Sequence, residues 1–370
     1  MDTLTQIVLG ASVSVAVLGG RLGPRQAAIT GGLLGTLPDM DVFIPAGDPV
    51  EAFVTHRGFS HSLLIQAMVT PVIGEVMMRT IPASRGLRWR TYAAIYLCLS
   101  THALLDAMTI YGTKLFWPLS LKPFGVGSIF IIDPLYTVPL LVVVVWALCY
   151  QNWTKYIRKA VIITLVLTTA YQAWCFGAQR IVLARTKEIL RQADIAPDRL
   201  LTTPLPFTSF FWRTMVLKND HYINIYTPLF GNTRDTTLYI HQRNLSLADC
   251  LRDNETFQRL SSFSQGFYRL DQNLDAIQYS DIRMGLTPNY VFSFFIAKLS
   301  DNGTRNIRPV RVSSSRSGPG DIDWLFANLL NYPKIRPTEK PHWIKIADLT
   351  HTVGNKSKQL GCGSMPPAKN

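Results

Sequence analysis

The sequence is short of the motifs that most readily reveal an enzyme. None of its five cysteines falls in a C-x-x-C pair, which argues against a zinc site built from thiolates. A G-x-S-x-G elbow, a Walker A loop and an H-E-x-x-H helix are also missing from the sequence. Serine hydrolases of the elbow type, P-loop nucleotidases and H-E-x-x-H metalloproteases are therefore not indicated.

Dense blocks of one charge are missing as well. The formal net charge is +13, but residues 1–184 carry 13 Lys or Arg against 8 Asp or Glu, and the remainder carries 24 against 16. Neither part combines a basic block with interleaved aromatic residues, so we expect no nucleic-acid partner. Anionic lipid headgroups are the simpler partner for a basic membrane protein. The first residues carry no basic stretch, which favours a retained helix over a cleaved signal peptide.

The first half of the chain does contain long apolar runs. Six can be drawn, at residues 4–20, 26–38, 61–81, 91–111, 130–150 and 157–180. A helix needs about 20 residues to cross the hydrocarbon core, and the last four runs reach this length. The second run is short and rich in glycine, and its small residues would let it pack closely on the first run. We therefore predict a multi-pass α-helical membrane domain of about six apolar helices over residues 1–184.

The second half, residues 185–370, contains no apolar run of that length. Alternating and β-rich stretches such as "HYINIYT" and "NYVFSFFIAKL" predict strands, and "DIDWLFANLLN" has the spacing of an amphipathic helix. This part is predicted to be a soluble, extramembrane α+β domain.

Basic residues alternate between the loops that join the predicted helices. Arginine and lysine gather after the first, third and fifth runs, and the other loops are poorer in them. Because cytoplasmic loops are enriched in Lys and Arg, this pattern places those three loops in the cytoplasm. The α+β domain would then face the periplasm of a bacterial inner membrane. The prediction depends on the run 26–38 crossing the membrane.

Polar, metal-capable side chains collect at the outer ends of these predicted helices. His102 and Asp106 are four residues apart and would share one helix face inside a span, where ionisable groups are costly and usually functional. The alternative is a buried pair that only holds helices together. Asp39 and Asp41 follow the second run in "LPDMDV", where acidic residues also serve ordinary turns.

The stretch "HRGFSHSLL" places His56 and His61 before the third run. Gly58 would let the backbone bend so that both imidazoles point inward. Two interfacial histidines without a shared role are the alternative. Arg57 lies between them and is a candidate phosphate clamp. Ser60, next to His61, is expected to hydrogen-bond the backbone or a ligand rather than act as a nucleophile.

Imidazoles and carboxylates without thiolates suit zinc, manganese, iron or nickel at a hydrolytic site. We predict divalent zinc, with manganese as the alternative, and one or two ions, since these six side chains exceed the needs of one tetrahedral ion. Two ions sharing a carboxylate would activate water for phosphoester hydrolysis. The predicted metal ligands are Asp39, Asp41, His56, His61, His102 and Asp106. The predicted catalytic residues are Asp39, Asp41 and Arg57, with one of the two carboxylates as general base.

Four stretches together carry a resemblance to a known family. "MDTLTQIVLG", "GTLPDMDV", "HRGFSHSLL" and "STHALLDAMTIYGTKLFWP" resemble the YdjM-like family of bacterial membrane-bound metal-dependent hydrolases over residues 1–135. The resemblance implies that the six residues named above are the metal-binding set. It also implies a distant similarity to zinc-dependent phospholipase C. The chain departs from the family at Gln6, where many members carry His, so no ligand is expected from the first run.

These observations predict an inner-membrane metal-dependent hydrolase. It would use a metal-activated water to cleave a phosphoester or similar bond of a lipid or lipid-linked substrate, as a phospholipase C-like phosphoesterase does. Two other classes stay open. A divalent-metal binding or transport protein would use the same ligands without hydrolysis, although transporters place polar groups nearer the membrane midplane. A membrane adaptor or regulatory protein would act through a partner bound by residues 185–370.

Overall fold

The computed structural model describes residues 1–230, 236–300, 303–313, 315, 317–330 and 332–345. The chain forms two compact units. The first contains Met1–Pro45, Thr55–Ala178 and Pro204–Ser209, and the second contains Ala46–Val54, Gln179–Thr203 and the chain from Phe210 onward. The boundary predicted at residue 184 falls inside one continuous helix, Lys155–Gln192. The segment Ala46–Val54, before this helix, belongs to the second unit, and the segment Pro204–Ser209, after it, belongs to the first.

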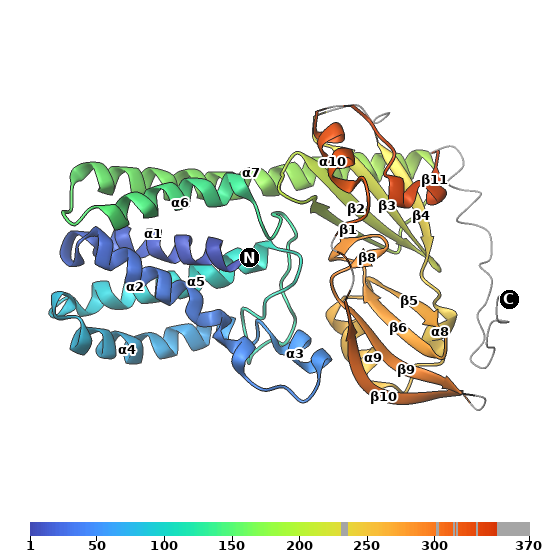
Figure 1. The fold of residues 1–370 in the computed structure, drawn as a ribbon, viewed down its shortest axis with the longest axis horizontal. Helices are drawn as coiled ribbons and strands as arrows, with labels where there is room; N and C mark the ends of the chain where they lie inside the picture. Colours follow the sequence, from blue (N-terminus) through green and yellow to red (C-terminus); the bar gives the residue numbers. More distant parts are fainter. Residues whose placement is uncertain (231–235, 301–302, 314, 316, 331, 346–370) are drawn as a thin grey trace. The chain divides into compact units, whose positions relative to one another are not determined.

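The first unit is helical (Figure 1). Its α-helices are α1 (Thr3–Leu22), α2 (Pro24–Thr36), α4 (Leu63–Thr80), α5 (Arg88–Met108), α6 (Pro134–Cys149) and the first part of α7 (Lys155–Gln192). Short 3-10 helices η1 (Leu37–Phe43), η2 (Phe59–His61) and η3 (Pro82–Ser84) lie between them. Helix α1 is central, because it contacts α2, α5 and α6.

The prediction of about six apolar helices is wrong. In the described part of the chain, three helices are long and apolar enough to cross a membrane, namely α1, α4 and α7. Helices also form at the other apolar runs, but α2 has only 13 residues and α6 only 16. Helix α5 has 21 residues, and the arginines of its first turn together with His102 and Asp106 lower its hydropathy. Composition alone located the runs, whereas proline and polar residues decide where the helices begin and end.

Glycines bring α1 and α2 into close contact. A Cβ added at Gly10 would lie 2.4 Å from the carbonyl oxygen of Gly31, and one added at Gly31 would lie 2.3 Å from that of Gly10. A Cβ at Gly35 would lie 2.5 Å from the carbonyl oxygen of Gln6. Side chains at these positions would force the helices apart, so the small residues permit the packing. This packing fixes the end of α2, from which η1 continues.

The second unit is dominated by β-sheet. Its five-stranded sheet has the order β1-β2-β3-β4-β11 and its four-stranded sheet the order β10-β9-β6-β5, with a small pair β7-β8. The strands are β1 (Arg199–Pro204), β2 (Phe211–Lys218), β3 (His221–Pro228), β4 (Thr237–Gln242), β5 (Tyr268–Asn273), β6 (Ala276–Asp281), β7 (Gly285–Leu286), β8 (Asn289–Tyr290), β9 (Ser293–Ser300), β10 (Gly303–Val312) and β11 (Trp343–Ile344). The helices are α3 (Pro49–Thr55), α8 (Ser246–Asp249), α9 (Glu255–Phe263) and α10 (Asp321–Leu329). Sheet therefore makes up more of this unit than the predicted mixture of helices and strands implied.

A buried polar network joins the 3-10 helix η5 (Pro337–His342) to the five-stranded sheet. Asn224 and Tyr226 on β3 each donate a hydrogen bond of 2.7 Å to the carboxylate of Glu339. Burial would raise the pKa of Glu339, but the hydrogen bond with His241 and the charge of Arg336 outweigh it and hold the pKa at about 2. The carboxylate is therefore ionised and stabilises this unit through its partners.

Candidate metal centre

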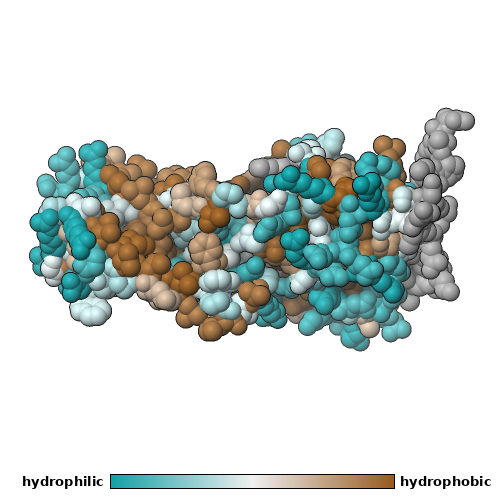
Figure 2. All heavy atoms as spheres, turned by 90° about the horizontal axis from the view of Figure 1, so that it is seen from below, coloured by the Kyte–Doolittle hydropathy of each residue, from teal (hydrophilic) through white to brown (hydrophobic). Residues whose placement is uncertain are grey.

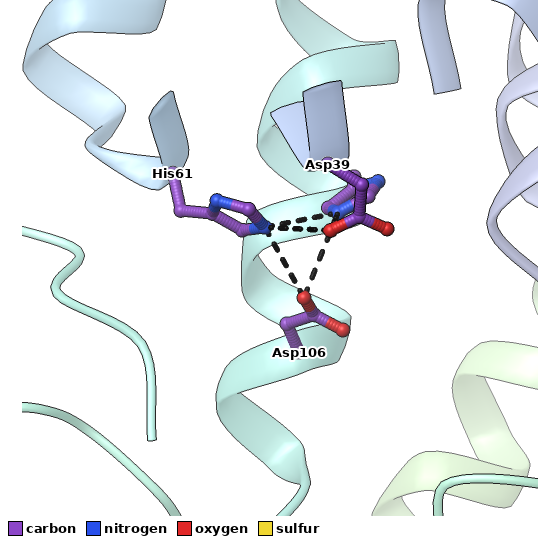
Figure 3. Close-up of side chains that lie close together, drawn as sticks. Asp39, His61 and Asp106 are labelled. Carbon is purple, nitrogen blue, oxygen red and sulfur yellow. Dashed lines mark hydrogen bonds and ion pairs between the residues drawn. The ribbon is translucent and has the colours of Figure 1, made fainter. Parts of the chain in front are cut away.

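Four of the predicted ligands, from three separate segments, meet in the helical unit. Asp39 lies on η1, His61 ends η2, and His102 and Asp106 lie one turn apart on α5. One ligand atom from each lies within 4.8 Å of the other three. Figure 3 shows Asp39, His61 and Asp106 pointing toward one another. The structure therefore contains a possible metal-binding cluster of two imidazoles and two carboxylates.

The distances within this cluster are short. The two imidazole Nε2 atoms of His61 and His102 are 3.1 Å apart. His61 Nε2 lies 3.4 Å from Asp39 Oδ1 and 3.3 Å from Asp106 Oδ2. His102 Nε2 lies 3.5 Å and 3.6 Å from the same two oxygens. Three of the side chains are buried and that of Asp39 is 22% exposed, so the cluster is open on the Asp39 side.

A backbone carbonyl sets the tautomer of His102. Its Nδ1 lies 2.6 Å from the carbonyl oxygen of Gly35, in the last turn of α2, where carbonyls lack partners within the helix. A carbonyl oxygen only accepts, so Nδ1 carries the hydrogen and Nε2 of the neutral ring keeps a lone pair. Nε2 is the atom that faces the cluster. The end of α2 thus orients His102 so that its Nε2 could bind a metal ion.

Asp41 sets the tautomer of His61 through Ser60. Burial would raise the pKa of Asp41, but hydrogen bonds from His56 and Ser60 outweigh it and hold the pKa below its ordinary value. The carboxylate is therefore ionised and accepts the Ser60 hydroxyl hydrogen, at 2.8 Å. Ser60 has no second hydrogen, so its oxygen accepts from His61 Nδ1, 2.9 Å away. His61 Nε2 is left with a lone pair facing the cluster.

The cluster gathers atoms that accept hydrogen bonds. Among the described residues, neither Asp39 Oδ1 nor Asp106 Oδ2 has a hydrogen-bond partner, and both atoms are buried. The two imidazole Nε2 atoms are 3.1 Å apart. These four atoms repel one another unless a cation or extra protons lie among them, and Arg57, with Nε 3.0 Å from Asp106 Oδ2, offsets the charge of that carboxylate. The two nitrogens and two oxygens form a ligand set that suits a divalent ion such as zinc or manganese.

Neighbouring side chains hold the ligand Asp106 from outside the cluster. Its Oδ1 accepts from Gln6 Nε2 at 2.9 Å and contacts the nitrogen of Met1. Its Oδ2 lies 3.0 Å from Nε of Arg57, whose guanidinium also donates to Thr109 Oγ1 at 3.3 Å. The Arg57 side chain is buried against this ligand, so the structure places it behind the cluster and not at an open surface.

Asp41 and His56 lie beside the four-residue cluster. His56 Nδ1 is 2.8 Å from Asp41 Oδ1, and the rings of His56 and His61 are 6.1 Å apart at their centroids. The other Asp41 oxygen accepts from Ser60 and from the backbone N–H of Arg57, at 2.8 and 3.0 Å. Arg57 has a positive φ of 61°, a rare conformation that lets its backbone meet Asp41 while its side chain meets Asp106. Metal ligation by Asp41 and His56 stays a prediction.

The model of the YdjM inner membrane protein family matches residues 1–182, which include every residue of this cluster. Residues 1–182 belong to the YdjM inner membrane protein family. The resemblance predicted from four sequence motifs is thereby confirmed, and the YdjM family indicates an inner-membrane location. No curated protein and no solved structure matches the chain.

The sequence missed several residues that position the ligands of the YdjM domain. Ser60 was expected to bond either the backbone or a ligand, and its place directly before His61 was the available signal. Gln6 was noted only as a departure from the family pattern, yet it contacts the ligand Asp106. Gly35 acts through its carbonyl oxygen, and a backbone group leaves no residue-specific signal in a sequence.

Proposed function

We propose that this YdjM-family protein is an inner-membrane metal-dependent hydrolase that cleaves a phosphoester or similar polar bond of a lipid or lipid-linked substrate. The observation that carries the proposal is the convergence of two imidazole nitrogens and two buried carboxylate oxygens, neither of which oxygens has a hydrogen-bond partner among the described residues. Zinc fits this ligand set, with manganese as the alternative. When bound, such an ion supplies Lewis acidity, which lowers the pKa of water and polarises the bond to be broken.

The pair of Asp41 and His56 supports the proton transfer that hydrolysis needs. Asp41 accepts the hydrogen of His56 Nδ1 at 2.8 Å, so Nε2 of that ring keeps the lone pair that can accept a proton. The His56 side chain is 23% exposed, whereas Asp41 is 6% exposed with both oxygens engaged. His56 therefore acts as the general base, and Asp41 orients it. Arg57 keeps Asp106 in place.

The positions of charged residues support a periplasmic site. Helix α1 begins next to the cluster and has Arg21 in its last turn, and α4 begins directly after His61 and has Arg79 in its last turn. Basic residues thus collect at the ends of these helices that lie away from the cluster. Because basic ends face the cytoplasm, the cluster faces the periplasm at headgroup depth in a multi-pass protein. Lipid phosphoesters are among the polar bonds found at that depth.

Metal content tests the proposal directly. The metal bound per chain is measured by inductively coupled plasma mass spectrometry on detergent-purified wild type, Asp106→Asn and His56→Gln. We expect about one ion or more in the wild type, none in Asp106→Asn, and wild-type content in His56→Gln, which keeps all four cluster residues. Both variants should lose hydrolysis of bis(p-nitrophenyl) phosphate and of phosphatidylglycerol–phosphatidylethanolamine vesicles.

Two results would contradict the proposal. A wild type without metal after reconstitution with zinc and manganese would show that the cluster is only a buried polar contact. A metal-loaded wild type that hydrolyses neither substrate class would reject the hydrolase and leave a metal-binding or adaptor protein.

A further inference from the structure

Exposed apolar side chains lie on the segments that carry or adjoin Asp39 and His61, outside the membrane-length helices. We call them the apolar collar; they are Met40, Val42, Phe43, Ile44, Phe59 and Leu119, with between 46% and 81% of each exposed. Several exposed apolar side chains on such short segments are unusual on a protein face in water and point to an interaction there.

The apolar collar is attached directly to the ligand-bearing segments. Met40 follows the ligand Asp39 on η1, and Phe59 lies on the same 3-10 helix as the ligand His61. The loop that carries Leu119 is joined to η2, because Ser62 Oγ donates to the carbonyl oxygen of Trp117 at 2.5 Å. Four of the six collar residues therefore lie on η1 or directly after it, the segment that carries Asp39.

The exposed apolar surface of α4 runs up to the apolar collar. Leu64, Met68, Val72 and Val76 are exposed and recur every four residues, so they form one stripe along this helix. Helix α4 is long and apolar enough to cross a membrane, and only 22% of its apolar window is buried within the structure. An exposed apolar stripe on a membrane-spanning helix faces acyl chains. The stripe begins directly after η2, which carries Phe59.

A second stripe reaches the apolar collar along α2. Ile29, Leu33 and Leu37 also recur every four residues and are exposed. Leu37 begins η1, whose two acidic residues differ in their contacts. Asp39 belongs to the cluster, and Asp41 accepts a hydrogen bond from Ser60. Figure 2 shows hydrophobic residues over much of the helical part of this face, with hydrophilic residues at its outer end. The collar thus continues the exposed apolar stripes of α2 and α4.

We propose that the apolar collar lies among the acyl chains of the outer leaflet, and that the substrate is a bilayer lipid that reaches Asp39 sideways from the membrane. The acyl chains of the substrate lie along the collar while its polar bond meets the cluster. This inference rests on the proposed function, which already names a lipid or lipid-linked substrate, and goes beyond it by assigning the route through which the lipid enters.

Spin-label accessibility tests the location of the apolar collar. Val42→Cys and Phe43→Cys are labelled in a Cys149→Ser background, because Cys149 is the exposed one of the free cysteines in the described residues. The protein is placed in phosphatidylethanolamine–phosphatidylglycerol nanodiscs, and the unsubstituted background is subtracted. Oxygen partitions into acyl chains, whereas a nickel chelate stays in water. Controls are Met68→Cys on the α4 stripe and Ile322→Cys on α10, both exposed.

We expect labels at positions 42 and 43 to collide mainly with oxygen, as the label at Met68 should, while the label at Ile322 collides mainly with nickel. Nickel-dominated labels in the collar would overturn the inference, because the collar would then lie in water. Low collision rates with both reagents would also overturn it, because protein would then cover the collar. Metal content is measured on the same samples, so that failure of the metal centre is recognised separately.

Lipid hydrolysis gives a second readout. A Val42→Ser/Phe43→Ser variant with wild-type metal content should lose about a hundredfold more activity on vesicle lipids than on bis(p-nitrophenyl) phosphate, since each of the two apolar side chains contributes about one order of magnitude when buried against an acyl chain. Equal loss on both substrates would contradict lateral lipid entry.

Discussion

Replacing Ser60 with alanine tests whether the hydrogen bond between Ser60 and His61 strengthens metal binding at the candidate centre. Ser60 donates to Asp41 at 2.8 Å and lies 2.9 Å from His61 Nδ1, so its oxygen keeps the hydrogen of His61 on Nδ1. The Ser60→Ala variant removes this acceptor without touching any atom of the cluster. We expect the variant to fold, to keep the four cluster residues in place, and to bind the metal more weakly.

The size of the loss follows from the burial of His61, whose side chain is 0% exposed. A buried N–H without an acceptor costs about 1–3 kcal/mol. In the metal-free variant the ring avoids that cost by moving the hydrogen to Nε2, where Asp106 and Asp39 accept it at 3.3 and 3.4 Å. Metal binding must reverse this tautomer change, so the affinity should fall roughly 5- to 150-fold. A water molecule in the vacated position would give the smaller value.

A competition titration against a chromophoric zinc chelator measures this affinity on detergent-purified protein. Ser62→Ala is the matched control: Ser62 donates to the carbonyl oxygen of Trp117 and caps the backbone N–H of Ile65, but it does not contact His61. It should lower thermal stability and leave metal affinity unchanged. Wild-type affinity in Ser60→Ala, or an equal loss in both serine variants, would refute the tautomer argument.

Three further changes are informative. Gly31→Ala should destabilise the helical unit by about 1–3 kcal/mol, because the new Cβ would lie 2.3 Å from a carbonyl oxygen of α1, whereas Gly177→Ala, with nothing within 4 Å, should be neutral or slightly stabilising in the same thermal unfolding assay. Arg57→Lys should lower metal affinity about tenfold in the zinc titration, because an ammonium lacks the forked guanidinium that contacts both Asp106 and Thr109. Glu339→Gln should destabilise the second unit at pH 7 by about 3 kcal/mol. The folded-state pKa of Glu339 is about 2 against an ordinary 4.5. Its contribution is therefore complete above pH 4.5 and disappears as the pH falls toward 2, and denaturant unfolding across this range should show the decline in the wild type and not in the variant.

The helix count shows how far apolar runs can guide a prediction. The run 130–150 is long enough to span a membrane, but α6 begins only at Pro134, where Asp133 caps it through the N–H groups of Leu135 and Tyr136. Proline suits the first turn of a helix and a carboxylate suits its cap, so these local preferences shorten the helix. The run 26–38 likewise gives way to the 3-10 helix η1 at Leu37. Signals at helix ends were therefore more informative than run length.

The ligand set was partly predictable. The sequence singled out all four cluster residues, because each lies inside an apolar run or at the end of one, where ionisable groups are costly and usually functional. These residues are Asp39, His61, His102 and Asp106. The sequence did not separate Asp39 from Asp41. On η1 there are about three residues per turn, so side chains two positions apart point in directions about 120° apart. One carboxylate therefore faces the cluster and the other faces Ser60.

The dispersal of the ligands along the chain has a consequence beyond chemistry. His61 and His102 are separated by 41 positions, and Asp39 lies on a third segment. A cation held by these residues acts as a reversible cross-link between η1, η2 and α5. By mass action, free metal at 100 times its dissociation constant would add about 2.7 kcal/mol to the stability of the folded state. The amount of folded protein in the membrane should therefore follow the supply of metal to the cell, also in a His56→Gln variant, which keeps all four cluster residues.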